Sequence, residues 1–386
     1  MTILLVDDNQ VNLFVIEKIL KGAGYDNCVS LTSAHALFDY LNLDDENSKT
    51  NSVDLILLDI MMPEIDGIEA CRRIQQVERL KHIPIIFVTA LEDSSKLVEA
   101  LDAGGTDYVT KPINKVELLA RMRVALRLKA EIDWHTEHEK KIQTELDLAT
   151  HVQQNLLSPP LREKDIQMEV SYYPSFKLAG DMYYWHKIDE HRYGIILFDM
   201  MGHGISASLV CMFISSVLRE AIKSLVDPEQ VITELNRYME LLHSEKDEIP
   251  YYFTAIYLVI DTEAKTVEYV NAGHPEGYML VDEHMLVPLQ RGSCPVGFFE
   301  EMDVQKSVVS FEDDVQILLF TDGALESMGP CENESALRLQ KLTEQKWTNP
   351  QTFMNEIFSE EQKLNQPDDM CVLMIQAQAQ AQAQAQ

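Results

Sequence analysis

The first 112 residues alternate short apolar segments with segments of helical periodicity, and this alternation limits the folds open to the chain. Strands are expected at residues 2–9, 28–31, 53–59, 83–90 and 106–112. Residues 53–59 and 83–90 are apolar almost throughout, which is typical of strands buried on both faces. Strands of this kind separated by helices predict a parallel, doubly wound α/β sheet.

Polar residues stand where these strands end. The set consists of Asp7, Asp8, Asp59, Thr89 and Lys111. Ligands of doubly wound sheets lie beyond the carboxyl ends of the strands, so these side chains should share one edge. Three acids beside one lysine suit a hard cation and leave one acid free to react. The alternative is that Asp7 and Asp8 cap the first helix and Lys111 is a surface charge, but five positions in one pattern favour the site.

These residues stand in four motifs: the paired acids, Leu-Leu-Asp-Ile-Met-Met-Pro, Val-Thr-Ala and Lys-Pro. With them, residues 1 to about 125 resemble a response-regulator receiver domain, which has a flavodoxin-like fold. The resemblance implies that Asp59 accepts a phosphoryl group from a histidine kinase or phosphotransfer protein. It implies a Mg²⁺ site made of Asp7, Asp8, Asp59 and the backbone carbonyl of Met61. It also implies the switch residues Thr89, Tyr108 and Lys111.

A long helix should follow, because residues 113–157 contain neither glycine nor proline. Apolar residues recur near a 3.5-residue period, which predicts a parallel coiled-coil dimer. His135, Glu139 and Gln153 interrupt that seam, and the alternative is a helix packed on its own C-terminal domain. His135, His138 and His151 are expected to be solvated, since no acid or cysteine completes a metal site. Pro159 and Pro160 end the helix.

The second half of the chain is organised around residues 198–204, Phe-Asp-Met-Met-Gly-His-Gly. Asp199 ends an apolar strand, and Gly202 and Gly204 permit a tight turn after it. Similar acidic positions occur at Asp181, Asp322 and the pair Asp368-Asp369. Carboxylates gathered at strand ends repel one another unless a cation neutralises them, so a metal site is expected. The alternative at Asp199 is a simple helix cap.

Six motifs then follow in a fixed order: Gly180-Asp181, Asp199-x-x-Gly-His-Gly, Asn271-Ala-Gly-His274, Pro295-x-Gly297, Thr321-Asp-Gly-x-x-Glu326 and Asp368-Asp-Met370. With these motifs the C-terminal three-fifths of the chain resembles the metal-dependent PPM-type serine/threonine phosphatases of the SpoIIE/RsbU branch. The resemblance implies an α+β sandwich of two sheets flanked by helices. It implies two Mn²⁺ or Mg²⁺ ions held by Asp181, Asp199, the carbonyl of Met200, Asp322 and Asp368.

In that family, Asp199, Asp322 and Asp368 would be catalytic, and a water activated by the metals would attack a phosphoserine or phosphothreonine. Asp181 would act through metal-bound water, and Asp368 is preferred to Asp369 as the ligand. His203 and His274 are either general acids or loop-forming residues. The motifs themselves contain no basic residue for substrate phosphate. The substrate class implied is a phosphorylated STAS-domain anti-sigma-factor antagonist in a partner-switching pathway.

The expected strands of this half are residues 167–173, 182–188, 193–198, 252–260, 266–272, 277–281, 305–311, 315–320 and 370–376. Helices are expected near 204–224, 228–243, 334–344 and 350–361. The domain boundaries that follow are 1–124 for the receiver, 125–158 for the linker and 159–376 for the phosphatase domain. Residues 377–386, a Gln/Ala repeat, are expected to be disordered.

The formal net charge of −31 disfavours nucleic acid and anionic membranes as partners. The six cysteines have no metal or redox spacing, and no apolar stretch is expected to reach membrane-spanning length. A cytoplasmic protein is therefore expected. The function that competes with a regulated phosphatase is a non-catalytic module that sequesters a partner when its receiver is phosphorylated.

Overall fold

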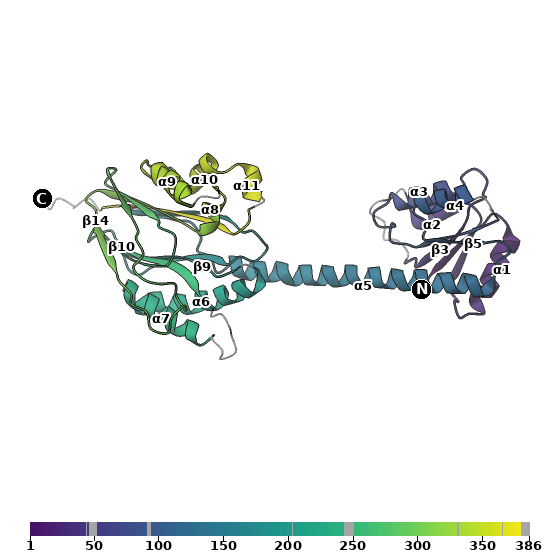
Figure 1. The fold of residues 1–386 in the computed structure, drawn as a ribbon, viewed down its shortest axis with the longest axis horizontal. Helices are drawn as coiled ribbons and strands as arrows, with labels where there is room; N and C mark the ends of the chain where they lie inside the picture. The colour runs from purple at the N-terminus through teal and green to yellow at the C-terminus, as the bar shows by residue number, and fades with distance from the viewer. Residues whose placement is uncertain are drawn as a thin grey trace. The chain divides into compact units, whose positions relative to one another are not determined.

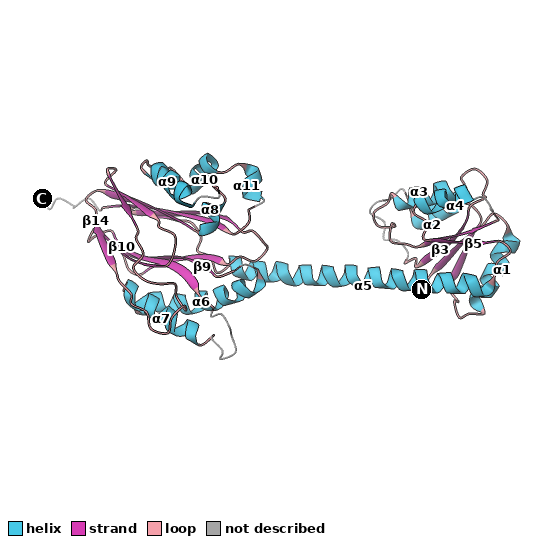
Figure 2. Cartoon of the chain, in the orientation of Figure 1, coloured by secondary structure: helices cyan, strands magenta, loops and turns pink. Residues whose placement is uncertain are grey.

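The computed structural model describes residues 1–43, 45, 52–90, 94–202, 204–242, 251–329, 332–364 and 366–379. The chain divides into two compact units, Met1–Ile142 and Gln143–Gln386. Each unit is described by itself, and Figures 1 and 2 show the elements of both.

The first unit is a five-stranded parallel sheet with the order β2-β1-β3-β4-β5. Its elements are β1 (Ile3–Val6), α1 (Gln10–Lys21), β2 (Cys28–Leu31), α2 (Ala34–Leu41), β3 (Leu55–Asp59), α3 (Gly67–Gln75), β4 (Ile85–Thr89), α4 (Ser94–Asp102) and β5 (Asp107–Thr110). One face packs on α2, α3 and α4, and the other packs on α1 and the start of α5. The predicted doubly wound sheet is therefore confirmed.

Helix α5 (Lys115–Gln154) is continuous over 40 residues, as the absence of glycine and proline predicted. Its first turns belong to the first unit, because Leu118, Met122 and Ala125 are buried in the core formed with α1. The boundary expected at residue 125 thus falls inside one unbroken helix.

The second unit is a sandwich of two antiparallel sheets, as the fold-class prediction required. One sheet has the order β14-β11-β10-β9-β8 and the other β13-β12-β15-β16-β7-β6. The strands are β6 (Leu161–Arg162), β7 (Ile166–Tyr173), β8 (Asp181–Lys187), β9 (Arg192–Met200), β10 (Phe253–Asp261), β11 (Thr266–Ala272), β12 (Tyr278–Val281), β13 (Met285–Pro288), β14 (Ser307–Ser310), β15 (Asp314–Phe320) and β16 (Met370–Gln378). Their inner faces alternate with outward residues and share one core.

Helices cover both outer faces of the sandwich. They are α6 (Ile205–Ser224), α7 (Pro228–Glu240), α8 (Asp322–Glu326), α9 (Glu332–Thr343), α10 (Pro350–Ile357) and α11 (Glu360–Leu364). Helices α6 and α7 pack on the β8–β9–β10–β11 face, and α8, α9 and α10 pack on the opposite sheet. Figure 2 shows the two magenta sheets between these helix layers. The short elements β6, β13 and α8 were not anticipated, because two to five residues carry too little periodicity.

The prediction for the Gln/Ala repeat was wrong at its beginning. Strand β16 continues to Gln378, and Ala377 is fully buried, paired with Ile166 on β7 and Val315 on β15. The repeat has the period of a strand, so its first alanine fills an inward position while the glutamines face outward. Residues 380–386 lie outside the described residues.

The expectation that no apolar stretch reaches membrane length also needs correction. Helix α6 is long and apolar enough, by length and composition, to cross a membrane. Its buried residues, among them Cys211, Ile214 and Leu218, pack on the sheet. The buried core helix of a soluble domain can have the same length and apolar composition, so α6 is weak evidence for a membrane span.

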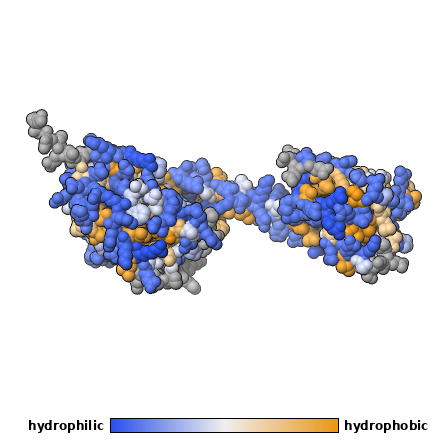
Figure 3. All heavy atoms as spheres, turned by 90° about the horizontal axis from the view of Figure 1, so that it is seen from above, coloured by the Kyte–Doolittle hydropathy of each residue, from blue (hydrophilic) through white to orange (hydrophobic). Residues whose placement is uncertain are grey.

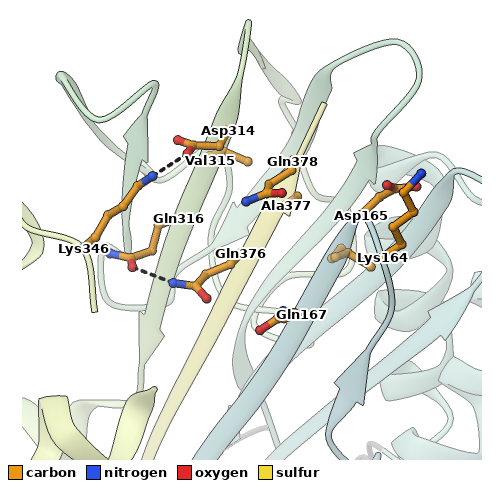
Figure 4. A pocket seen from close by; sticks show the side chains of 11 residues that line it. Lys164, Asp165, Gln167, Asp314, Val315, Gln316, Lys346, Gln376, Ala377 and Gln378 are labelled. Atoms are coloured by element: carbon orange, nitrogen blue, oxygen red, sulfur yellow. Dashed lines mark hydrogen bonds and ion pairs between the residues drawn. The ribbon is translucent and has the colours of Figure 1, made fainter. Parts of the chain in front are cut away.

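The outer face of the β15–β16–β7 sheet turns polar where its helices stop. A pocket of about 210 Å³ lies there, and Figure 4 shows the polar side chains that line it, among them Gln316, Gln376 and Lys346. Gln316 accepts hydrogen bonds from Gln376 Nε2 (3.1 Å) and the Trp347 amide (2.9 Å), and Lys346 pairs with Asp314. Gln316, Gln376 and Lys346 are thus paired, whereas Asp314 Oδ1 is buried without a hydrogen-bond partner among the described residues. The face of the second unit seen in Figure 3 is likewise largely hydrophilic.

Candidate functional sites

The carboxyl edge of the parallel sheet gathers the acids predicted for the receiver site. Asp7 follows β1 and Asp59 ends β3; both are buried, whereas Asp8 is exposed. One oxygen from each of the three carboxylates lies within 4.8 Å of the others. Lys111 Nζ donates to Asp7 Oδ2 (2.9 Å) and to Asp59 Oδ2 (2.8 Å). Three acids against one lysine leave an excess of negative charge, and hard oxygen donors of this kind fit Mg²⁺.

Burial raises the pKa of the Asp59 carboxyl, and the neighbouring Asp7 carboxylate adds to the rise, while Lys111 acts against it. Burial acts to lower the pKa of Lys111, but its hydrogen bonds to Asp59 and Asp7 outweigh that effect and raise it. The lysine is therefore held as a cation against the Asp59 carboxylate.

The loop after Asp59 folds back on it closely enough to require glycine. A Cβ on Gly67 would lie 2.1 Å from the Asp59 carbonyl oxygen. Asp66 caps α3 by accepting from the Glu69 amide (2.8 Å), and the Met61 amide lies 3.4 Å from Asp59 Oδ1. The Met61 amide thus lies beside the Asp59 carboxylate, and the role expected of the Met61 carbonyl stays a prediction.

Thr89 lies on β4, which pairs with β3, and Tyr108 lies on β5, the edge strand beyond it. Thr89 ends β4 and is fully buried. Tyr108 on β5 is half-buried, and the Arg121 guanidinium lies 5.6 Å from its ring centre. Arg121 also pairs with Asp107 at 2.6 Å. The receiver residues named from the sequence therefore share one end of the sheet, and their individual roles stay predictions.

The four acidic positions of the second unit meet at one end of the sandwich. Asp181 begins β8 and pairs in register with Asp199 on β9, while Asp322 begins α8 and Asp368 precedes β16. Burial raises the pKa of Asp199 to about 9, and the adjacent carboxylates of Asp322 and Asp368 contribute. Burial also raises the pKa of Asp181 well above its usual range, with the Asp199 charge adding to the rise.

These acids are more widely spaced than the receiver trio. Among the described residues, only Asp7, Asp8 and Asp59 place three ligand oxygens within 4.8 Å of one another. The second set nevertheless suffers mutual repulsion, and repulsion between fixed oxygen donors is relieved by divalent cations. Mn²⁺ or Mg²⁺ therefore fits the donor set of Asp181, Asp199, Asp322 and Asp368.

The two sheets are joined at this end by Thr321, whose role the sequence did not reveal. Thr321 Oγ1 donates to Asp181 Oδ2 (2.6 Å) and accepts from the Cys371 amide (3.0 Å). The residue is fully buried. It lies in the Thr-Asp-Gly motif, so a polar residue buried directly before the acid was the available signal.

The two adjacent aspartates before β16 have different environments. Asp369 is buried and accepts from the Ser175 amide (2.6 Å), Ser175 Oγ (2.9 Å) and the Gly180 amide (2.6 Å). Asp368 is half-buried, and its charge acts on Asp199. Asp369 thus holds the loop before β8, and the geometry favours Asp368 as the ligand. Gly323 permits this approach, since a Cβ there would lie 2.1 Å from the Asp369 carbonyl.

The turn after Asp199 needs glycine at two positions. Gly202 and Gly204 have φ values of +81° and +84°, a region that side chains with a Cβ rarely adopt. The Met200 carbonyl oxygen lies 3.3 Å from where a Cβ on Gly180 would be, so this carbonyl faces the loop that leads to Asp181. His203 lies outside the described residues.

His274 is suited to shaping the site and not to proton transfer. It is fully buried, and burial lowers its pKa to about 3, with the Arg291 charge acting in the same direction. Its Nδ1 lies 2.8 Å from Thr254 Oγ1, and its amide donates to Asn271 Oδ1 (2.8 Å). Thr254 is the register partner of Asp199, so the neutral imidazole supports the strand that carries the acid.

The end of α5 is attached to the loop before Asp181. Gln153 Nε2 donates to the Ala179 carbonyl (2.8 Å), and the Ala179 amide donates to Gln153 Oε1 (3.1 Å). Ser208 Oγ on α6 donates to the same carbonyl (3.0 Å). The sequence had marked Gln153 only as an interruption of the apolar seam, because periodicity says nothing about a buried amide pairing with a distant backbone.

Two family matches cover most of the chain. The family described as "Response regulator receiver domain" matches residues 3–123, and the family described as "Stage II sporulation protein E (SpoIIE)" matches residues 189–378. The chain joins a receiver domain to a SpoIIE-type PPM phosphatase domain. The resemblances inferred from the motifs are thereby confirmed. Asp181 lies outside the matched residues of the SpoIIE-type domain.

Individual relatives match one domain each. "Phosphoserine phosphatase RsbP" of Bacillus subtilis is 39% identical over 187 residues, which are 48% of this chain and 46% of that protein. "Response regulator PleD" of Caulobacter vibrioides is 34% identical over 131 residues, 34% of this chain and 27% of that protein. The chain thus spans less than half the length of these two relatives.

A solved structure shares the fold of the second unit. The "SiaA-PP2C domain of Pseudomonas aeruginosa" superposes with a TM-score of 0.52 and 20% identity, covering 63% of this chain and 99% of that one. At this identity the likeness concerns the fold alone.

Proposed function

We propose that the chain is a phosphorylation-regulated protein serine/threonine phosphatase. The observation that carries the proposal is the meeting of Asp181, Asp199, Asp322 and Asp368 at one end of the sandwich, with the pKa of Asp199 raised to about 9. The domain matches and the similarity to a phosphoserine phosphatase support the same reaction class.

The carboxylates of this site would hold two divalent cations. When bound, the cations would activate a water for in-line attack on phosphorus and stabilise charge on the phosphoryl oxygens. Asp199, Asp322 and Asp368 would hold the cations together with the Met200 carbonyl, and Asp181 would act more peripherally. Thr321 fixes the Asp181 carboxylate, and no covalent phosphoenzyme is required.

The receiver would set the state of the phosphatase domain. An Asp59 oxygen would form a bond to the phosphorus of a kinase phosphohistidine as the nitrogen–phosphorus bond breaks. Lys111 already contacts Asp59 at 2.8 Å and would pair with the phosphoryl oxygens, with Thr89 and Tyr108 as switch residues. Helix α5 connects the two domains, and its exposed apolar residues, such as Leu128 and Ile142, support a coiled-coil homodimer.

The proposed substrate is a phosphorylated STAS-domain anti-sigma-factor antagonist of a partner-switching pathway, in the cytoplasm. The support is the similarity to SpoIIE-type proteins and to a phosphoserine phosphatase. The acidic net charge of −31 argues against nucleic acid as the target.

The test is phosphate release by the full chain in Mn²⁺ or Mg²⁺ from p-nitrophenyl phosphate and from a phosphoserine peptide. Turnover should need the divalent cation and fall at least about a hundredfold in Asp199→Asn, because a proposed metal ligand is lost. Asp314→Asn, which changes a carboxylate on the distant polar face of the sheet, is the matched control and should keep most activity.

A non-catalytic sequestering module is the competing function. It predicts no turnover in either cation, together with metal-independent, phosphorylation-dependent capture of a partner. Turnover that survives in Asp199→Asn would also contradict the proposed mechanism.

A further inference from the structure

A cavity of about 620 Å³ opens beside the acid cluster of the SpoIIE-type domain. Asp322, one of the four converging acids, lies in its lining, as does Thr254, the register partner of Asp199. The buried side chains of Tyr278 and Phe320 supply apolar lining. A cavity of this size, with charged and polar side chains beside its apolar lining, is suited to a small part of a larger substrate, such as one phosphorylated side chain and its neighbours.

Arg291 is the one lysine or arginine among the described residues that line this cavity. It is exposed and forms no ion pair with any residue that the structure describes. Its position is fixed by the backbone: the next residue, Gly292, donates to the Asn271 carbonyl (2.9 Å), and a Cβ on Gly292 would lie 2.3 Å from the Gln305 carbonyl. The arginine is therefore presented on an anchored turn.

Arg291 lines the same cavity as Asp322, and its charge acts on a residue that supports the acid cluster. It contributes to the lowered pKa of His274, which is bonded to Thr254 next to Asp199. A phosphate monoester carries close to two negative charges and must approach a domain end occupied by four carboxylates. Divalent cations neutralise the acids, but the remaining phosphoryl oxygens still favour a cation on the open side. The planar guanidinium pairs with two phosphate oxygens at once.

We propose that Arg291 binds the phosphoryl group of the phosphoserine or phosphothreonine segment that enters this cavity. The proposal rests on the proposed function and adds a specificity residue that the family motifs do not contain, since Arg291 lies between the Asn-Ala-Gly-His and Pro-x-Gly motifs. Glu276 lines the same cavity. Its negative charge would weaken the binding of the phosphoryl group and would disfavour substrates that carry further negative charge.

The first experiment compares Arg291→Ala, Arg291→Lys and wild type in the full chain with Mn²⁺. The substrates are p-nitrophenyl phosphate and a synthetic phosphoserine peptide. For Arg291→Ala we expect KM to rise about tenfold for both substrates with kcat within about twofold, because ground-state and transition-state binding are lost together. Arg291→Lys should show a smaller rise, since it keeps the charge but not the planar fork. Glu276→Gln should lower KM.

Arg162→Ala is the matched control, because Arg162 is an exposed arginine on β6 outside the cavity lining. It should leave KM unchanged. Unchanged KM in Arg291→Ala contradicts the proposal. A rise for the peptide but not for p-nitrophenyl phosphate also contradicts it, because Arg291 would then contact flanking residues and not the phosphoryl group.

A binding measurement separates this proposal from the proposed function. Binding of the labelled phosphoserine peptide is measured by fluorescence anisotropy in Mn²⁺, with Asp199→Asn as the parent protein. The double variant Asp199→Asn/Arg291→Ala should have a Kd about tenfold higher than the parent, and Asp199→Asn/Arg162→Ala should have the same Kd as the parent. Absence of wild-type turnover would refute the phosphatase, whereas an unchanged Kd would refute the role of Arg291.

Discussion

At the scale of the residue, the SpoIIE-type domain keeps carboxylates in positions that are unfavourable without a counterion. Asp181 is almost fully buried and pairs in register with Asp199. The pKa of Asp199 is raised from 3.8 to about 9. The folded metal-free protein therefore holds a proton at Asp199 over a pH range in which the unfolded chain does not. Stability should fall as pH rises through that range.

This repulsion gives a prediction for the metal-free protein. In EDTA, the melting temperature of the wild type should decrease between pH 5 and pH 8. The melting temperature of Asp199→Asn should change less over this pH range, and the variant should be more stable than the wild type at pH 8 by about 1–3 kcal/mol. Mn²⁺ should stabilise wild type more than the variant. Scanning calorimetry checks both, and a wild-type protein that gains stability from pH 5 to pH 8 in step with the variant would contradict the site.

Thr321 gives the second prediction at this scale. Thr321→Val keeps the shape but removes the hydroxyl that bonds Asp181 and the Cys371 amide. We expect a loss of about 1–3 kcal/mol in the free energy of unfolding, because buried partners are left unsatisfied. Thr321→Ser, which keeps the hydroxyl, should lose less in urea denaturation. Equal losses in the two variants would mean that packing, and not the hydrogen bonds, matters at this position.

At the scale of the element, the end of α5 is part of the SpoIIE-type domain. Gln153 makes two hydrogen bonds to Ala179, and Arg219 on α6 donates to the Leu156 carbonyl (2.7 Å) just beyond the helix. Ala179 is two residues before Asp181. The helix that leaves the receiver is thus fastened to the loop that presents a candidate metal ligand.

Gln153→Ala tests this connection. It should destabilise the domain by about 1–3 kcal/mol, because the Ala179 amide and carbonyl lose buried partners. The adjacent Gln154 is exposed, so Gln154→Ala is the control and should change stability by less than about 0.5 kcal/mol. Matching melting temperatures for the two variants would show that the amide pair does not hold the loop.

The element scale also shows what the sequence could and could not predict. Strands such as Thr266–Ala272 were placed residue for residue, because apolar alternation and turn residues mark them. The acids were predicted to share a site because these same strand boundaries place them at the ends of strands. Thr321, Gln153 and Arg291 were missed, since their roles depend on distant partners. The Gln/Ala repeat was misjudged because composition was given more weight than its two-residue period.

At the scale of the whole molecule, α5 leaves apolar residues exposed along its length. Leu128 and Ile142 are about half exposed, two heptads apart. We expect a dimer in sedimentation velocity, shifted toward monomer by the double variant Leu128→Asp/Ile142→Asp. Val116→Asp, an exposed position outside that seam, is the control. A wild-type chain that sediments as a monomer at micromolar concentration would contradict the coiled coil.

The central claim is that the state of Asp59 controls hydrolysis at the Asp199 site. The measurement that tests it most directly is phosphate release from a phosphoserine peptide in Mn²⁺, with and without beryllofluoride, for wild type and Asp59→Asn. We predict that beryllofluoride changes the wild-type rate at least about threefold and leaves Asp59→Asn unaffected, because the variant lacks the acceptor carboxylate. A wild-type rate that is the same with and without beryllofluoride would contradict the claim.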